Sequence, residues 1–271
     1  MEDALDAAKE FFSLPTEEKV LLASDNVHKP VRYGTSLNHD WIHLWPSNPP
    51  SYREKMRKYV KQVHILHKQL MEMVLESMGI NPSDLQEEIE EGSQVLAVNC
   101  YPACPEPELA LGMPPHSDYG SLTILLQSCQ GLQLKDHNEN WIPVPVVEGG
   151  LVVQLGDQME VLSNGRYKSV IHRATVNAEK ERFSLASLHS FALDRNVRPA
   201  PELVDKEHPY SYKGFSFSDF LDFISSNDIV KGRFIDTLKR KPSKKMQVHA
   251  SEDMHMHSVH AYAQRRMMNA T

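Results

Sequence analysis

The chain has 271 residues, of which 41% are hydrophobic and 24% charged, values typical of a globular protein with a sizeable core. Its formal net charge is −7, and basic residues gather only at 53–61 and 238–245, so we expect no nucleic-acid partner. Three cysteines without paired spacing argue against a disulfide framework. No signal peptide pattern and no run near the roughly 18 apolar residues of a membrane span is present, so we predict a soluble, cytoplasmic protein without membrane contact.

The first fifty residues are predicted to combine helix and loop. Residues 1–24 have a helical pattern that breaks at Pro15, because proline lacks the backbone N–H and fixes its own φ. Residues 25–50 are rich in Asn, Gly, Ser and Pro, which predicts a loop.

The next segment predicts two helices. Residues 52–78 carry apolar residues at spacings of three and four, the pattern of one long amphipathic helix. Ser51 and Glu54 fit a capping box at its start. A shorter helix is expected to begin at Asn81 and Pro82 and to end before Gly92.

From residue 93 the pattern changes to short strand-like runs separated by Gly, Pro, Asn and Asp, which predicts a sandwich, jelly roll or barrel. The runs are SQVLAVNCY, SLTILLQ, GLQLKD, WIPVPV, GLVVQLG, YKSVIHRATVN and RFSLASLHSFA. SLTILLQ is expected to be a half-buried strand, and a hairpin is expected to turn near His137–Asn140. Residues 216–240 return to a helical pattern.

Residues 241–271 differ in composition from the rest and are predicted to form a separate tail. The tail carries His255, His257 and His260, a spacing that suggests metal binding. A disordered tail is the better interpretation, because terminal polar segments are commonly disordered.

The stretch PPHSDYGSLTILLQ at 114–127 places two polar residues beside an apolar strand. Side chains at positions i and i+2 of a strand share a face, so His116 and Asp118 are expected to project together. A single His-x-Asp pair occurs readily by chance. His172, which by itself fits a hydrogen-bonded strand histidine, completes a set of two imidazoles and one carboxylate, the ligand set of non-haem Fe(II) oxygenases.

Two further pairs of residues have side chains that can bind a small organic acid. Arg182 and Ser184 alternate on one strand, and an arginine fork beside a hydroxyl is a receptor for a carboxylate. Asn99 and Tyr101 are likewise spaced i and i+2, and both can donate hydrogen bonds. Cys104 lies among prolines without a flanking His or Lys, so we interpret it as structural rather than nucleophilic.

Together these residues resemble the plant 2-oxoglutarate- and Fe(II)-dependent dioxygenase superfamily over about residues 8–240. The strings NCYPACPEPELALGMPPHSD, LTILLQ, VVQLGDQMEVLSNGRYKSVIHR and RFSLAS are similar to the core of that family. FFSLPTEEK, YGTSLN and WPSNPPSYREKMRKY indicate the branch that holds flavanone 3-dioxygenase-like and downy-mildew-resistance-like oxygenases.

The resemblance implies a mainly β fold, a double-stranded β-helix (jelly roll, cupin-like) with flanking helices. It implies oxidation of a small aromatic plant metabolite, by hydroxylation or by desaturation, with release of succinate and CO2. A flavanone or related phenolic is the first candidate substrate and salicylate the second. Fe(II), 2-oxoglutarate, O2 and ascorbate are the implied cofactors and cosubstrates, and a monomer is expected. The resemblance assigns iron binding to His116, Asp118 and His172, cosubstrate binding to Arg182, Ser184, Asn99 and Tyr101, and substrate contact to Tyr119, Leu188 and Ser190.

The resemblance also divides the chain into four segments: a remnant of an N-terminal region (1–50), a helical segment (51–92), the jelly-roll core (93–240) and the tail (241–271). Relatives usually carry a further segment before FFSLP and a longer version of SLNHDWIHLWP, so early strands of the jelly roll are expected to be missing. The alternative hypothesis is therefore that this chain is a truncated, catalytically impaired isoform that acts as a binding or regulatory jelly-roll protein. A zinc hydrolase is disfavoured, because His-Glu-x-x-His is absent and Arg182 and Ser184 would have no role.

Overall fold

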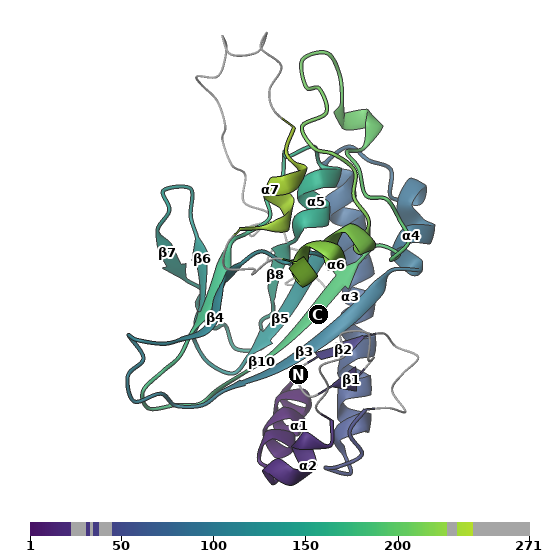
Figure 1. The fold of residues 1–271 in the computed structure, drawn as a ribbon. Coiled ribbons are helices and arrows are strands. Elements are labelled where there is room, and N and C mark those ends of the chain that lie inside the picture. The colour runs from purple at the N-terminus through teal and green to yellow at the C-terminus, as the bar shows by residue number, and fades with distance from the viewer. Residues whose placement is uncertain (23–30, 33–34, 38–44, 227–231, 241–271) are drawn as a thin grey trace. The chain divides into compact units, whose positions relative to one another are not determined.

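Two antiparallel sheets form the centre of the fold, and helices flank them (Figure 1). The computed structural model describes residues 1–22, 31–32, 35–37, 45–226 and 232–240. The chain divides into two units, Met1–Arg240 and Lys241–Thr271, and the second, with the tail histidines, lies outside the described residues. The sheets and helices confirm the predicted class, mainly β with flanking helices.

The larger sheet has the strand order β1-β2-β3-β10-β5-β8, and the smaller sheet has the order β4-β9-β6-β7. The strands are β1 (Val31–Arg32), β2 (Thr35–Leu37), β3 (Ser93–Tyr101), β4 (Leu111–His116), β5 (Leu122–Gln127), β6 (Leu132–Lys135), β7 (Trp141–Pro143), β8 (Val152–Leu155), β9 (His172–Thr175) and β10 (Arg182–Ser190). The helices are α1 (Glu2–Phe12), α2 (Thr16–Val20), α3 (Tyr52–Ser77), η2 (Pro82–Leu85), α4 (Gln86–Glu90), α5 (Asp157–Leu162), η3 (Pro201–Leu203), α6 (Phe217–Ser226) and α7 (Phe234–Leu238).

Strand β10 lies in the middle of the larger sheet and separates two environments. It pairs with β3 along its whole length, from Arg182 opposite Tyr101 to Ser190 opposite Ser93, and with β5 on its other side. Because side chains alternate along a strand, its even-numbered residues face the space between the two sheets. Its odd-numbered residues, such as Phe183 and Leu185, are buried in the core that the helices share with this sheet.

The helical layer contains α1 and α3, and the amphipathic pattern of each helix explains how the two pack together. In α1 the small residues Ala4, Ala7 and Ala8 are buried, which lets this helix pack closely against α3. The break at Pro15 and the long helix at 52–78 are confirmed, as is the shorter helix that begins at Pro82.

The predicted capping box at the start of α3 was wrong. Ser51 is the N-cap residue, but its side chain makes no capping hydrogen bond. Its hydroxyl instead lies 3.4 Å from a carboxylate oxygen of Glu10, and Lys55 forms an ion pair with the same carboxylate. The tertiary contact with α1 therefore competes with the local capping interaction that the sequence pattern suggested.

The predicted loop at 25–50 was wrong where β1 and β2 lie. These short strands pair with each other, and β2 pairs with β3 through Ser36 opposite Leu96 and Leu37 opposite Val95. Much of the remaining segment lies outside the described residues. The edge of β3 is therefore paired with β2, whereas the strands expected to be missing belong to a segment before FFSLP, which β1 and β2 follow.

Three other local features differ from expectation. Strand β5 is buried on both faces rather than on one, because the cavity side is enclosed by the smaller sheet and the other side by α3. Strand β4 was not predicted, since it contains two prolines and two register shifts. Helix α5 was not predicted either, because it is short and all six of its residues, polar ones included, are buried, so it has no solvent-exposed face.

The hairpin of β6 and β7 is confirmed, with Lys135 paired to Trp141. Asp136 accepts backbone N–H bonds from Asn138 and Asn140, which closes the turn. The three cysteines are free, in agreement with the predicted lack of disulfides. None of the helices in the described ranges has the length and apolar character to cross a bilayer.

Candidate metal and cosubstrate site

His116, Asp118 and His172 converge at one end of the smaller sheet. His116 ends β4, His172 begins β9, and the two residues are directly paired across these strands. The Nε2 atoms of both histidines lie 3.6 Å from Oδ1 of Asp118, and the two rings are 4.2 Å apart between centroids. We expected His116 and Asp118 to meet because they would lie two residues apart on one strand. That reason was wrong, since Asp118 follows the end of β4 and the next strand, β5, belongs to the larger sheet.

Backbone carbonyls orient both histidine rings. Nδ1 of His116 lies 2.8 Å from the carbonyl oxygen of Pro114, and Nδ1 of His172 lies 3.1 Å from that of Val170. A carbonyl only accepts, so Nδ1 carries the hydrogen and the lone pair of Nε2 points toward Asp118. Burial, and then the nearby His172, lowers the pKa of His116, which favours the neutral form that a metal ligand needs.

Two contacts hold Asp118 in place, one at its carboxylate and one at its backbone carbonyl. Thr123 on β5 donates its hydroxyl hydrogen to Oδ2 at 2.5 Å, so Oδ1 is the oxygen that faces the histidines. The backbone N–H of Asp157, the first residue of α5, donates to the carbonyl oxygen of Asp118 at 2.8 Å. Thr123 was missed from the sequence; the available signal was a single hydroxyl residue within the apolar run LTILL of β5.

The three side chains fit a divalent iron site. Each offers one ligand atom, and these atoms lie within 4.8 Å of one another. Two neutral imidazoles and one carboxylate on one side of an ion leave further positions open, which is the Fe(II) arrangement of oxygenases rather than a closed structural zinc site. The residues present therefore fit a resident Fe(II) ion.

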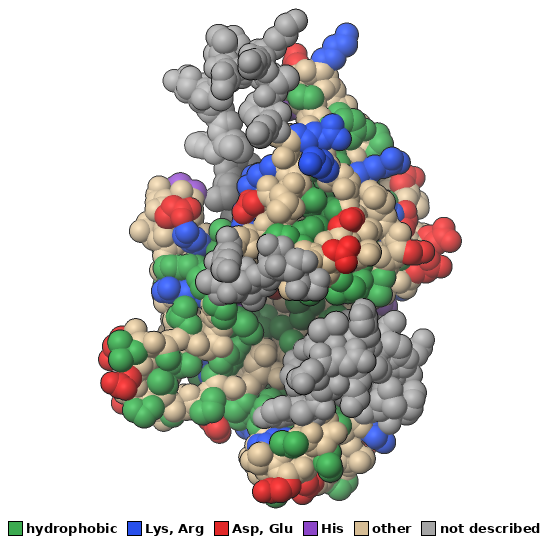
Figure 2. Space-filling view, viewed as in Figure 1, with side chains coloured by type: hydrophobic (Ala, Val, Ile, Leu, Met, Phe, Trp, Pro, Cys, Tyr) green, Lys and Arg blue, Asp and Glu red, His purple; other side chains and the backbone are tan. Residues whose placement is uncertain are grey.

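A cavity between the two sheets contains this triad together with the predicted cosubstrate residues. Hydrophobic side chains gather around the central hollow of the face seen in Figure 2, with acidic and basic side chains toward its edges. The residues that line the cavity are Ala97, Asn99, Tyr101, Met113, His116, Asp118, Thr123, Leu125, Leu132, Gln154, His172, Arg173, Ala174, Arg182, Ser184, Ala186 and Leu188.

Arg182 is a buried cation in this cavity, with 3% of its surface exposed. It donates from Nη2 to Oε1 of Gln127 at 3.1 Å and from Nε to the carbonyl oxygen of Cys129 at 3.2 Å. No acidic side chain in the described part of the chain forms an ion pair with it. Burial lowers the pKa of this guanidinium, because loss of water disfavours its charged form. An anionic ligand would supply a partner of opposite sign.

The neighbours of Arg182 complete a polar wall. The hydroxyl of Ser184 lies 3.5 Å from Nη1 of Arg182, and Asn99 donates to the same hydroxyl at 3.4 Å. The guanidinium lies 5.1 Å from the centre of the Tyr101 ring. Gly131 leaves the space that Arg182 needs, since a Cβ there would lie 2.6 Å from the arginine Cδ. The structure therefore brings all four predicted cosubstrate residues together.

Of the three predicted substrate contacts, only Leu188 lines the cavity in the described part of the chain. The ring of Tyr119 stacks on Phe220 of α6 at 4.2 Å. Ser190 lies on the same face of β10 as Leu188 but at its end, where its hydroxyl pairs with that of Ser93 at 2.8 Å. Tyr119 and Ser190 are thus not among the residues that line the cavity, and their contact with a substrate stays a prediction.

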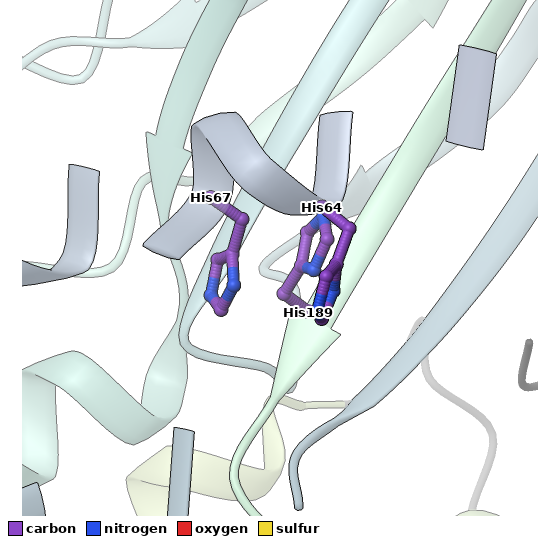
Figure 3. Close-up of side chains that lie close together, drawn as sticks. All are labelled: His64, His67 and His189. Carbon is purple, nitrogen blue, oxygen red and sulfur yellow. The ribbon is translucent and has the colours of Figure 1, made fainter. Parts of the chain in front are cut away.

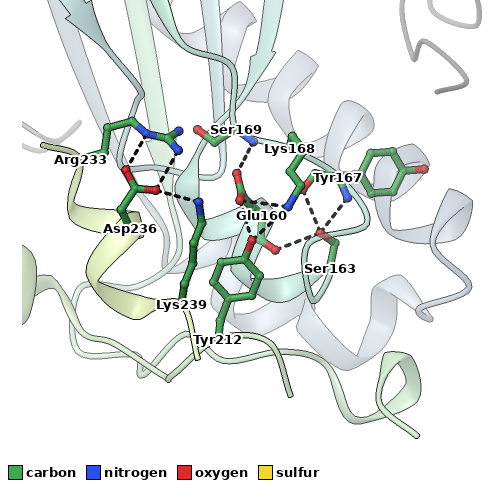
Figure 4. A network of polar contacts seen from close by, with 9 residues as sticks. All are labelled: Glu160, Ser163, Tyr167, Lys168, Ser169, Tyr212, Arg233, Asp236 and Lys239. Carbon is green, nitrogen blue, oxygen red and sulfur yellow. Dashed lines mark hydrogen bonds and ion pairs between the residues drawn. The ribbon is translucent and has the colours of Figure 1, made fainter. Parts of the chain in front are cut away.

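A buried acidic residue of α5 supports the segment that leads to His172 (Figure 4). Glu160 accepts the hydroxyl hydrogen of Tyr212 at 2.6 Å and the backbone N–H of Ser169 at 2.8 Å. Lys168 forms an ion pair with the same carboxylate at 3.4 Å. These contacts anchor residues 168–169 just before β9 and so limit the movement of His172.

Comparisons with known proteins agree with this geometry. A model of the 2OG-Fe(II) oxygenase superfamily matches residues 92–190. Flavanone 3-dioxygenase 3 of Oryza sativa subsp. japonica is 46% identical over 258 residues, which cover 88% of this chain and 79% of that protein. Protein DOWNY MILDEW RESISTANCE 6 of Arabidopsis thaliana is 36% identical, covering 81% of this chain and 72% of that protein.

Solved structures show the same fold. The crystal structure of JOX2 in complex with 2OG, Fe and JA aligns with a TM-score of 0.80 at 32% identity, covering 89% of this chain and 78% of that one. The predicted jelly roll is confirmed by this likeness. With the sequence identity to the rice and Arabidopsis proteins, it shows that the chain belongs to the 2OG-Fe(II) oxygenase superfamily.

Proposed function

We propose that this protein is a 2-oxoglutarate- and Fe(II)-dependent dioxygenase that hydroxylates a small aromatic plant metabolite, a flavanone or related phenolic. The observation that carries the proposal is one cavity that holds both the His116, Asp118 and His172 ligand set and the unpaired cation of Arg182. The similarity to a rice protein named flavanone 3-dioxygenase 3 supports the substrate class.

Each group in the cavity has a defined task in this reaction. Bound Fe(II) supplies the redox chemistry that couples O2 to the conversion of 2-oxoglutarate into succinate and CO2 and to hydroxylation of the substrate. His116 and His172 hold the metal through Nε2, and Asp118 holds it through Oδ1. Arg182 and Ser184 bind the distal carboxylate of the cosubstrate, which sets its orientation toward the metal.

The apolar part of the cavity suits an aromatic substrate. Met113, Leu125, Leu132 and Leu188 line it, and such surfaces favour a flat apolar ring over a highly charged metabolite. The same side chains exclude water from the reacting groups. A flavanone and a phenolic acid such as salicylate share this aromatic character, so both classes belong in the test.

The test measures succinate release from the purified chain with Fe(II), ascorbate, 2-oxoglutarate and a panel of flavanones and phenolic acids. We expect at least one compound to stimulate release, and we expect His116→Ala to abolish it. His137→Ala is the matched control, because this histidine is exposed in the β6–β7 turn, and it should retain the wild-type rate.

A folded protein that binds Mn²⁺ and 2-oxoglutarate but releases no succinate with any compound would contradict the proposal. That result would favour the alternative, a catalytically impaired binding or regulatory protein. The enzyme has more support than this alternative, because every predicted metal and cosubstrate residue lines the same cavity.

A further inference from the structure

A second group of histidines lies on the face of β10 that points away from the cosubstrate cavity (Figure 3). His64 and His67 come from successive turns of α3, and His189 comes from β10. Each offers one ring nitrogen, and these nitrogens lie within 4.8 Å of one another. The group draws on no residue of the triad at His116, and the proposed dioxygenase reaction gives it no task.

The group is buried, and one member lacks hydrogen-bond partners. His67 is 3% exposed and His189 is 1% exposed, whereas His64 is half-buried. Neither ring nitrogen of His67 has a hydrogen-bond partner. Its ring stacks on that of His189, with centroids 4.0 Å apart and planes 7° from parallel. His189 Nε2 lies 3.1 Å from the hydroxyl of Ser187.

A buried imidazole without partners is costly, because its N–H and its lone pair have both lost water. The surroundings also keep this ring uncharged: burial, with His64 and Lys68 nearby, lowers the pKa of His67 to about 3. Neutral imidazoles are the form that binds metal ions. A bound cation would accept the lone pair of His67 and so replace one of the two interactions that this ring lacks.

We propose that His64, His67 and His189 form a second metal site, which takes a divalent transition-metal ion of the Zn²⁺ class. Three imidazole nitrogens without a carboxylate suit zinc and its neighbours, whereas Ca²⁺ and Mg²⁺ require oxygen ligands. Zinc bonds to imidazole are about 2.0–2.1 Å long, so the stacked rings turn inward when the ion binds. The half-buried His64 provides the side from which the ion enters.

The bound ion would tie α3 to β10 and leave the Fe(II) site on the other face of the sheet unchanged. The site is therefore structural, and its loss should be detected by metal content and by thermal stability rather than by turnover alone. Besides a bound zinc ion, we expect Zn²⁺ to stabilise the fold, since an ion that binds only the folded state raises the melting temperature.

The test counts zinc ions in the full chain after metal removal and dialysis against excess Zn²⁺. The background carries His255→Gln, His257→Gln and His260→Gln, so that tail histidines contribute no zinc. We expect two ions per chain in this background, one at the Fe(II) ligands and one at the new site. His67→Gln should reduce the count to one.

His64→Ala is the second variant, because a half-buried position tolerates substitution if His67→Gln fails to fold. It should also lose one ion, and His137→Gln should lose none. A double His116→Ala, His172→Ala variant should retain one ion, and the melting temperature of that variant should still rise with Zn²⁺. Equal zinc content in the background, His67→Gln and His64→Ala would overturn the proposal and leave the three rings as a packing cluster.

Discussion

A single hydroxyl group determines which oxygen of Asp118 faces the two histidines. Thr123 donates to Oδ2 at 2.5 Å, and this contact leaves Oδ1 at 3.6 Å from both Nε2 atoms. Partners of this kind typically change metal affinity by about 10- to 100-fold. Thr123→Val keeps the shape and removes the donor, so we expect metal affinity to fall at least about tenfold.

Mn²⁺ titration of the chain, with Mn²⁺ in place of Fe(II), measures this effect. Thr123→Ser keeps the hydroxyl and is the matched control, with affinity near that of the wild type. Equal affinities for Thr123→Val and Thr123→Ser would show that the hydrogen bond does not orient the carboxylate.

Arg182 carries the positive charge that we assign to the distal carboxylate of 2-oxoglutarate. Arg182→Gln keeps a hydrogen-bond donor and removes the charge. Hydrogen bonds to charged groups contribute about 1.5–3 kcal/mol, so the dissociation constant for 2-oxoglutarate should rise about 10- to 100-fold. Calorimetric titration in the presence of Mn²⁺ measures it.

Lys180→Gln is the control for Arg182→Gln, since it makes the same change of charge two residues away at an exposed position. It should leave 2-oxoglutarate binding unchanged. If both variants weaken binding equally, the effect comes from the overall charge and the role of Arg182 is refuted.

At the scale of elements, the packing of α3 on β10 depends on neutral histidines. The pKa of His67 is about 3 in the folded chain against an ordinary value of 6.5, mainly because of burial, with His64 and Lys68 adding to the shift. Between these pH values His67 binds a proton in the unfolded state but not in the folded state. The contribution of neutral His67 to the free energy of unfolding is therefore complete above pH 6.5 and is lost as the pH falls below it. Each pH unit in this window should cost about 1.4 kcal/mol.

Urea unfolding with a chelator present, at several pH values from 7 to 5, tests this prediction. The free energy of unfolding of the wild type should fall more steeply with acidification than that of His67→Gln, by about 1.4 kcal/mol per unit below 6.5. Parallel pH profiles for the two proteins would mean that His67 takes up its proton in the folded state at an ordinary pKa.

At the scale of the whole Met1–Arg240 unit, the candidate site joins the two sheets. The histidine ligands come from β4 and β9 of the smaller sheet, whereas Arg182 and Asn99 come from β10 and β3 of the larger one. A cosubstrate bound to both the metal and Arg182 therefore connects the sheets. We expect Mn²⁺ and 2-oxoglutarate together to stabilise the fold by more than the sum of their separate effects.

Thermal unfolding with each ligand alone and with both measures this coupling. A ligand at about 100 times its dissociation constant adds about 2.7 kcal/mol, which gives a readily measured rise in melting temperature. In Arg182→Gln the further rise from 2-oxoglutarate should be much smaller. Additive shifts in the wild type would argue against a ligand shared between the sheets.

Local patterns predicted a large part of this architecture. The spacing of apolar residues was sufficient to predict α3, and the alternation of side chains along a strand placed Arg182 and Ser184 on one face of β10. Elements without such a pattern were missed: β4 contains prolines, α5 is buried on every side, and β1 and β2 are too short to show a period. The capping box at Ser51 failed because Glu10, distant in sequence, contacts its hydroxyl.

The sequence by itself determined the family and the chemistry that we propose for the main site, because the residue types and the spacing of His116, Asp118, His172 and Arg182 resemble one superfamily. Only the tertiary structure decided how these residues meet. Asp118 reaches the histidines through a turn between sheets, and Thr123 and Asp157 hold it there. The histidines at 64, 67 and 189 were also brought together by packing alone, since α3 and β10 are far apart in sequence and contact only in the folded chain.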